Sequence, residues 1–64
     1  MKTIKSHSPS NGNQFFYVET EHGFMCSFTR DFEDVWFSDD LDTDTPIEGP
    51  DAETIEELVA EITA

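Results

Sequence analysis

Carboxylates are the most abundant reactive groups in this sequence, and they are concentrated in its second half. The 64 residues include fifteen Asp or Glu and three Lys or Arg, which gives a net charge of −12 at pH 7. The only acids before Arg30 are Glu19 and Glu21, and no Lys, Arg or His follows it. Such segregation predicts a surface that meets a basic partner. Nucleic acid and anionic membranes would both repel this charge, so we expect neither to be bound directly.

Three aspartates alternate at positions 40, 42 and 44, as the first three ligands of an EF-hand calcium loop do. Asp51 then falls at the twelfth position of that loop. The match fails where the geometry is strict, because Thr45 replaces the glycine of the sharp turn and Asp51 replaces the bidentate glutamate. We therefore expect no metal site and no cofactor. Weak calcium binding by Asp40, Asp42 and Asp44 is kept as an alternative.

The other groups that could do chemistry are Cys26, His7 and His22, which lack the ligand spacing of a zinc site. Cys26 is the only cysteine, which excludes an internal disulfide and favours a reducing compartment. The three glycines are scattered, so no phosphate-binding loop is present. The chain also has no apolar run at its start and none of about 20 residues elsewhere. We expect a cytoplasmic protein that is not an enzyme.

The preferred function is imitation of a nucleic-acid backbone. If the segment from residue 40 to 44 is extended, its alternate aspartates stand about 6.6 Å apart. Along a helix, Glu53, Glu57 and Glu61 would be spaced by about 6 Å. Both rows resemble neighbouring phosphates on one strand, and a basic groove built for DNA expects closely spaced anions. The predicted partner is therefore a basic nucleic-acid-binding protein or complex.

Trp36 lies inside the acidic half and is a candidate interface anchor, since Trp is favoured at the centres of interfaces. Core packing is the equally weighted alternative for it. Small, very acidic α+β proteins without an active site are typical of inhibitors made by phages and mobile elements, such as anti-CRISPR proteins. This analogy of charge and size favours an inhibitor. The residues predicted to bind the partner are Asp31, Glu33, Asp34, Trp36, Asp39, Asp40, Asp42, Asp44, Glu48, Glu53, Glu57 and Glu61.

These side chains must be positioned by a small fold, and the pattern predicts one domain over residues 1–64. Turn residues at 8–13 and at 21–23 separate stretches that are rich in aromatic and β-branched residues. The expected fold class is α+β, with an antiparallel meander of three to four strands and one C-terminal amphipathic helix packed on one face. The expected strands are Lys2–Ser6, Gln14–Thr20, Phe24–Thr29 and Glu33–Phe37. A helical turn over Phe32–Phe37 is the alternative to the last strand, which its aromatic and β-branched content favours.

The hairpin around Gly23 predicts which side chains share a face. A three-residue connection at 21–23 would set Thr20 opposite Phe24, and hence Val18 opposite Cys26 and Phe16 opposite Phe28. These last four residues then form the core face. The second face would carry Phe15, Tyr17, Glu19, Met25, Ser27 and Thr29.

The C-terminal stretch reads as a helix that begins after Asp51, which is a good N-cap residue. Ile55, Leu58, Val59 and Ile62 form one apolar stripe, which we expect to pack on the sheet. The glutamates at 53, 56, 57 and 61 then point to solvent. Two pairs of them are like charges four residues apart, which weaken the helix slightly.

The aromatic second face supports a competing function. It would make the protein a small interaction or immunity-type module that recognises its partner through Phe15, Tyr17 and Met25 rather than through charge. The same apolar face, together with the small core, makes a homodimer possible. Neutralisation of Asp40, Asp42 and Asp44 would spare binding by such a module, whereas Tyr17→Ala would abolish it.

Overall fold

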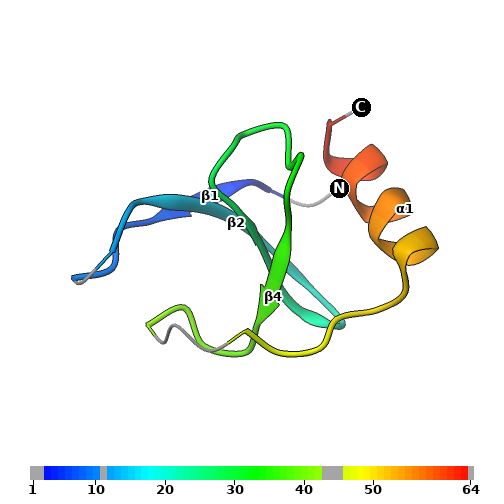
Figure 1. Ribbon diagram of the computed structural model, residues 1–64. Helices are drawn as coiled ribbons and strands as arrows, with labels where there is room; N and C mark the ends of the chain where they lie inside the picture. The colour runs from blue at the N-terminus through cyan, green and yellow to red at the C-terminus, as the bar shows by residue number, and fades with distance from the viewer. Residues whose placement is uncertain (1–2, 11, 43–45, 64) are drawn as a thin grey trace.

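A computed structural model describes residues 3–10, 12–42 and 46–63. Within them, four antiparallel strands form a meander in the order β1-β2-β3-β4, and one helix lies beside the sheet (Figure 1). The elements are β1 (Lys5–His7), β2 (Phe15–Thr20), β3 (Gly23–Ser27), β4 (Trp36–Ser38) and α1 (Ala52–Thr63). The predicted α+β class is therefore confirmed. Thr3 and Ile4 were predicted in the first strand but precede β1, and Lys2 lies outside the described residues. The fourth strand begins three residues later than predicted.

The β2–β3 hairpin has a tighter turn than the sequence pattern predicted. Thr20 pairs with Gly23, so the loop contains only two residues. Gly23 has a φ of 111°, which favours glycine. The Thr20 hydroxyl closes this turn, since it donates to the carbonyl oxygen of Gly23 at 2.7 Å and accepts from the His22 N–H at 3.0 Å.

This turn makes the predicted register of β3 wrong by one residue. Val18 lies opposite Met25, not opposite Cys26. A shift of one residue moves every side chain of a strand to the other face. Met25 is therefore in the core, whereas Cys26 lies on the opposite face between Tyr17 and Trp36. Phe28 was predicted in the core, but it follows the end of β3 and is 60% exposed.

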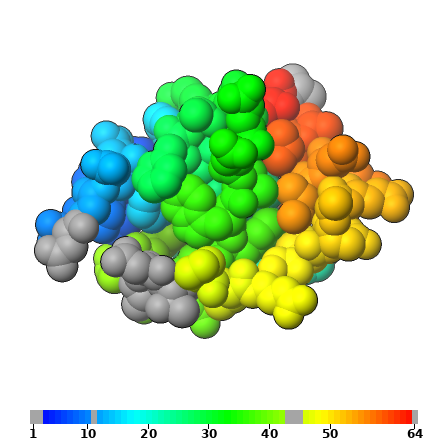
Figure 2. Space-filling model, in the orientation of Figure 1, coloured from blue at the N-terminus to red at the C-terminus, as the bar shows by residue number. Residues whose placement is uncertain are grey.

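The core lies between α1 and one face of the sheet. Its buried side chains are Val18, Met25, Phe32 and Phe37. The predicted helical stripe packs against them, as does Phe16 of β2. Figure 2 shows this part of the molecule, with α1 in orange beside the green segment that contains Phe32. The stripe residues Ile55, Leu58, Val59 and Ile62 stay half-buried because only one layer of sheet covers them.

A turn in the β3–β4 connection places Phe32 in the core. Its N–H donates to the carbonyl oxygen of Thr29 at 3.2 Å, and its φ is 55°. This left-handed conformation is uncommon for a residue with a side chain and costs about 1 kcal/mol or more. Burial of the ring offsets that cost, because only 2% of Phe32 is exposed. The turn also explains why β4 begins only at Trp36.

The predicted faces of the last strand are confirmed. Val35 and Phe37 pack into the core, and Trp36 points to the other side of the sheet. Residues 46–49, which we call the returning segment, run back along β4 at the edge of the sheet. There the Ile47 N–H donates to the carbonyl oxygen of Phe37 at 2.8 Å. Gly49 then lies against the Phe37 ring so closely that an added Cβ would stand 2.6 Å from a ring carbon. The returning segment thus seals the core at this edge.

Asp51 caps α1 as predicted. Its Oδ1 accepts a hydrogen bond of 2.9 Å from the Thr54 N–H, and its carbonyl oxygen accepts one of 3.0 Å from the Ile55 N–H. Hydrogen bonds from Thr54 hold the pKa of the Asp51 carboxyl below its usual range, and the bond from the Thr54 side chain lowers it more than the bond from the Thr54 backbone. In the part of the chain that the structure describes, no helix has the length and apolar character needed to cross a membrane.

Candidate functional site

Every acidic residue that the structure describes is exposed to solvent. His7 pairs with Asp42 at 3.1 Å, and His22 pairs with Glu21 at 3.6 Å. Arg30 lies over the ring of Phe16 instead, with its guanidinium carbon 5.5 Å from the ring centre. The negative charge of the sequence therefore appears on the molecular surface. The fold divides it between two sides of the sheet.

The first group of acids belongs to α1 and to the β3–β4 connection, which shares a groove with the helix, and we call it the helix-side acidic surface. Its residues come from the β3–β4 connection and from the helix. They are Asp31, Glu33, Asp34, Glu53, Glu56, Glu57 and Glu61. The helical periodicity directs Glu53 and Glu57 away from the sheet, with Glu56 on one flank of the apolar stripe and Glu61 on the other.

A shallow groove joins the two parts of this surface. It has a volume of about 340 Å³ and lies between the β3–β4 connection and α1. Its floor is apolar, and Glu33 and Glu56 both line it. The residues around the groove are Phe32, Glu33, Val35, Ile55, Glu56, Val59 and Ala60. Glu56 was not among the predicted site residues, because its nearness to Glu33 arises only when the helix packs on the turn.

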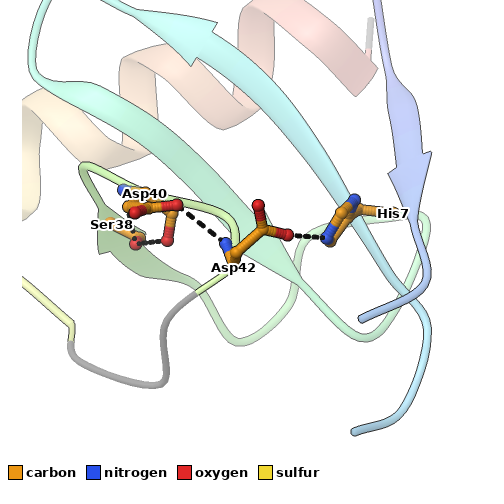
Figure 3. A network of polar contacts seen from close by, with 4 residues as sticks. All are labelled: His7, Ser38, Asp40 and Asp42. Atoms are coloured by element: carbon orange, nitrogen blue, oxygen red, sulfur yellow. Dashed lines mark hydrogen bonds and ion pairs between the residues drawn. The ribbon is translucent and has the colours of Figure 1, made fainter. Parts of the chain in front are cut away.

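The second group of acids lies in residues 39–42, which we call the strap. The strap leaves β4 at one edge of the sheet and reaches His7 on β1, at the opposite edge. Figure 3 shows its polar contacts. The Asp42 N–H donates to Oδ1 of Asp40 at 2.9 Å, and Asp42 Oδ1 lies 3.1 Å from Nε2 of His7. The strap thus crosses the sheet on the face opposite α1.

A tight turn at the base fixes how the strap leaves β4. The Ser38 hydroxyl donates to the Asp40 carbonyl oxygen at 2.7 Å and accepts from the Asp40 N–H at 3.1 Å (Figure 3). Residues 40–42 are therefore folded into turns, not extended. The expected spacing of about 6.6 Å between alternate aspartates rested on an extended chain. That premise is wrong for Asp40 and Asp42, while Asp44 lies outside the described residues.

The metal alternative gains no support from the part of the site that is described. Among residues 3–10, 12–42 and 46–63, no three Asp, Glu, His or Cys side chains gather as metal ligands. The calcium pattern needed Asp44, about which the structure says nothing. Weak calcium binding stays an untested alternative.

The sheet face beneath the strap is aromatic. Phe15, Tyr17, Phe24 and Trp36 lie on it, with the buried Cys26 among them. Their rings contact one another edge to face, for example Phe15 and Trp36 with centroids 5.5 Å apart. Met25 was predicted to share this face, and the register shift has replaced it with Cys26. The competing interaction module would therefore use a different set of side chains.

Leu41 of the strap separates two hollows on this aromatic face. One, of about 300 Å³, contains Phe15, Cys26 and Trp36, and Leu41 lies on its border. The other, of about 320 Å³, contains Tyr17 and Phe24, and Leu41 borders it as well. The first hollow, which we call the aromatic pocket, is lined by Pro9, Gly12, Asn13, Phe15, Cys26, Phe28, Trp36, Ser38, Asp40, Leu41 and Pro46.

Cys26 is unsuited to nucleophilic chemistry. It is fully buried, and its thiol donates to the carbonyl oxygen of Phe24 at 3.6 Å. Burial raises the pKa of this thiol from 9.0 to about 11, so it is protonated at neutral pH. The thiolate is the reactive form of cysteine. Cys26 therefore serves as a small packing residue at the base of the aromatic pocket.

The structure thus separates the predicted binding residues. Six belong to α1 or to the β3–β4 connection beside it, namely Asp31, Glu33, Asp34, Glu53, Glu57 and Glu61, and four belong to β4 or the strap, namely Trp36, Asp39, Asp40 and Asp42. Glu48 is exposed in the segment that returns along β4, and Asp44 lies outside the described residues. No flat partner could contact both sides of the sheet at once. Comparison with protein-family models, curated proteins and solved structures finds no match to this chain.

Proposed function

We propose that this protein is a non-enzymatic binding protein whose helix-side acidic surface occupies the basic nucleic-acid-binding surface of a partner protein or complex. The observation that carries this proposal is the row formed by Glu53, Glu57 and Glu61. All three are exposed on one capped helix, so their spacing of about 6 Å is held by the backbone. Regularly spaced anions on a rigid support are what a phosphate-binding groove recognises.

The row has a cost for the fold, which favours a role in binding. Glu53 and Glu57, and likewise Glu57 and Glu61, are like charges four residues apart, and each such pair costs a few tenths of a kcal/mol. The last turn of α1 contains no basic residue, and Glu61 lies close to the negative end of the helix. Neutral polar residues would stabilise the helix more at positions 57 and 61, whereas Glu53 lies in the first turn, where an acid is favourable. A role in binding would explain why Glu57 and Glu61 are nevertheless acidic.

The β3–β4 connection widens the same surface. Asp31, Glu33 and Asp34 precede β4 on the side of α1, and Glu33 shares the apolar groove with Glu56. A long basic side chain of the partner could lay its methylene groups in this groove while its charge meets both carboxylates. The helix-side acidic surface would thus offer the row of glutamates on α1 and, beside it, a groove that holds one basic side chain of the partner.

A second candidate function is recognition through the aromatic face, and the exposure of Phe28 favours it. Phe28 is 60% exposed and shares the lining of an open pocket with Phe15 and Trp36, and contiguous apolar patches of this kind mark interaction sites. Under this alternative, the acidic row serves mainly solubility. The two functions use opposite sides of the sheet, so substitutions separate them cleanly.

The experiment is affinity capture from a bacterial lysate with three baits. These are the wild type, the helix variant Glu53→Gln/Glu57→Gln/Glu61→Gln and a matched variant, Glu19→Gln/Glu21→Gln, which removes two charges outside the residues predicted to bind the partner. The proposal predicts that the wild type and the matched variant retain a basic nucleic-acid-binding protein. The helix variant should lose it, and duplex DNA or high salt should release it.

Capture that is equal for all three baits would overturn the proposal, as would a retained partner that ignores both DNA and salt. If Phe28→Leu rather than the helix variant abolishes capture, the aromatic face is the binding site. The identity of the retained protein would also show whether the target is a nuclease, a repressor, a polymerase or a CRISPR complex. Sedimentation of the free protein over a range of concentrations would test the predicted homodimer.

A further inference from the structure

The aromatic pocket has a composition that points to a specific kind of ligand. Three aromatic rings from three parts of the chain line it, namely Phe15 of β2, Phe28 after β3 and Trp36 of β4. The rings of Phe28 and Trp36 are 4.8 Å apart and inclined by 43°, and those of Phe15 and Trp36 are 5.5 Å apart and inclined by 63°. Rings at such different angles border one hollow from several directions.

The charged side chain that lines the pocket is acidic. Asp40 is the only charged residue among its described lining residues, and the strap beside it also carries Asp39 and Asp42. The faces of Trp and Phe rings attract cations, and an environment of carboxylates strengthens that attraction. An anion would be repelled from this place. A second copy of the chain would bring its own charge of −12 with it.

The size of the pocket restricts the ligand further. A volume of about 300 Å³ is at the lower end for small-molecule sites and suits one long side chain rather than a cofactor. Its lining is mostly apolar, which fits the methylene groups of Arg or Lys. We propose that the aromatic pocket binds one cationic side chain, Arg or Lys, of a partner polypeptide, with its charged group against the Trp36 and Phe28 rings.

This site is separate from the helix-side acidic surface, because it lies on the other face of the sheet. The two proposals can therefore fail independently. A partner that contacts α1 could reach the pocket only around an edge of the sheet, and a different basic polypeptide could use the pocket alone. The pocket proposal needs no knowledge of either partner for its test.

Trp36 makes the test direct, since it is the only tryptophan in the chain and lies in the pocket wall. Its fluorescence is followed while the wild-type protein is titrated with N-acetylarginine amide, N-acetyllysine amide and two neutral analogues, N-acetylcitrulline amide and N-acetylnorleucine amide, at constant ionic strength. The proposal predicts a saturable change with the two cationic probes, in about the millimolar range. The neutral analogues should bind at least several-fold more weakly.

Two matched variants test whether the cationic probes bind in the aromatic pocket. Phe28→Leu removes an exposed pocket ring but keeps an apolar side chain, and Phe24→Leu makes the same replacement at a half-buried ring of the neighbouring hollow. The affinity for N-acetylarginine amide should fall about two- to fivefold in the first variant and stay unchanged in the second. Because Phe28 is largely exposed, its replacement should leave the fold intact.

Four results would overturn the proposal. The first is no saturable response to the cationic probes, and the second is equal binding of the norleucine probe, which would make the pocket a plain apolar site. The third is a fluorescence change that depends on protein concentration alone, since the pocket would then be filled by a second copy of this chain. Equal weakening by Phe24→Leu and Phe28→Leu would also contradict it, because binding would not be confined to the pocket.

Discussion

Nε2 of His7 lies 3.1 Å from Oδ1 of Asp42, and this contact joins the two edges of the sheet across its aromatic face. The residues are 35 positions apart in the chain. His7 is itself held by the ring of Phe15, whose centroid is 5.5 Å away. Through Asp42, the contact sets the position of Leu41, which separates the aromatic pocket from the neighbouring hollow.

Removal of this contact should loosen the strap without unfolding the protein. Asp42→Ala deletes one exposed contact between side chains, so we expect the free energy of unfolding to fall by less than about 1 kcal/mol. The amide hydrogens of residues 39–42 should exchange with solvent faster, because the strap loses its anchor on β1. Asp39→Ala removes the same charge without touching His7. Exchange that is equal in the two variants would show that the contact does not hold the strap.

Gly49→Ala should destabilise the fold strongly for a change of one methyl group. The new Cβ would stand 2.6 Å from a carbon of the buried Phe37 ring, so the ring or the returning segment must move. Such overpacking typically costs about 1–3 kcal/mol. Gly12→Ala is the matched control, since its Cβ would meet Pro9 at an ordinary 3.4 Å. Thermal unfolding of both variants tests this, and an unchanged midpoint for Gly49→Ala would contradict the packing at the sheet edge.

The buried thiol of Cys26 predicts a loss of stability at alkaline pH. Its pKa is raised from 9.0 to about 11 in the folded protein, so the unfolded chain releases this proton first as pH rises. The contribution of Cys26 to the free energy of unfolding is constant below pH 9. Between pH 9 and about pH 11 the free energy of unfolding falls, by at most about 1.4 kcal/mol per pH unit. Denaturant unfolding of the wild type and of Cys26→Ala at several pH values isolates the effect. The two proteins should have parallel stabilities below pH 9 and diverge above it, and parallel curves throughout would contradict the burial of Cys26.

The acidic row on α1 predicts opposite effects on folding and on binding. Glu57→Gln removes both like-charge pairs of the row, so the free energy of unfolding should rise by a few tenths of a kcal/mol. Binding to the basic partner should weaken at the same time, because the row loses its middle charge. Chemical denaturation gives the free energy of unfolding, and capture at moderate salt reports the binding to the basic partner. A variant that loses stability, or one that binds as well as the wild type, would show that the row has another purpose.

The sequence was sufficient to predict the parts of the fold that are set by local signals. Asp51 followed by an apolar stripe of helical period predicted α1, its N-cap and its buried side. The aromatic and β-branched stretches between turn residues predicted the meander. In these segments, the preference of each residue for helix or strand depends mainly on its near neighbours, and the structure has the predicted helix and strands there.

The register of β3 could not be decided in this way. The sequence around Gly23 fits a loop of two residues as well as one of three. Met25 and Cys26 are both apolar, so neither alternative placed a polar side chain in the core. The choice depends on packing, since the observed register buries the larger Met25 under α1 and leaves Cys26 on the aromatic face.

The site depends even more on contacts between distant residues. Neither the His7–Asp42 contact nor the shared groove of Glu33 and Glu56 leaves a local signal in the sequence. The charge segregation did predict that the acids would be exposed. It could not predict that the sheet would divide them, because the path of residues 39–42 is set by Ser38 and His7 together.

Displacement of fluorescently labelled duplex DNA from the captured partner, followed by fluorescence anisotropy, shows whether the helix-side acidic surface occupies the nucleic-acid site. Added wild-type protein should release the DNA at stoichiometric amounts, and Glu53→Gln/Glu57→Gln/Glu61→Gln should need a much higher concentration to do so. Release should weaken as salt rises, since charge drives both interactions. A complex in which the partner holds DNA and this protein together would contradict the account, because the acidic surface would then bind somewhere other than the nucleic-acid site.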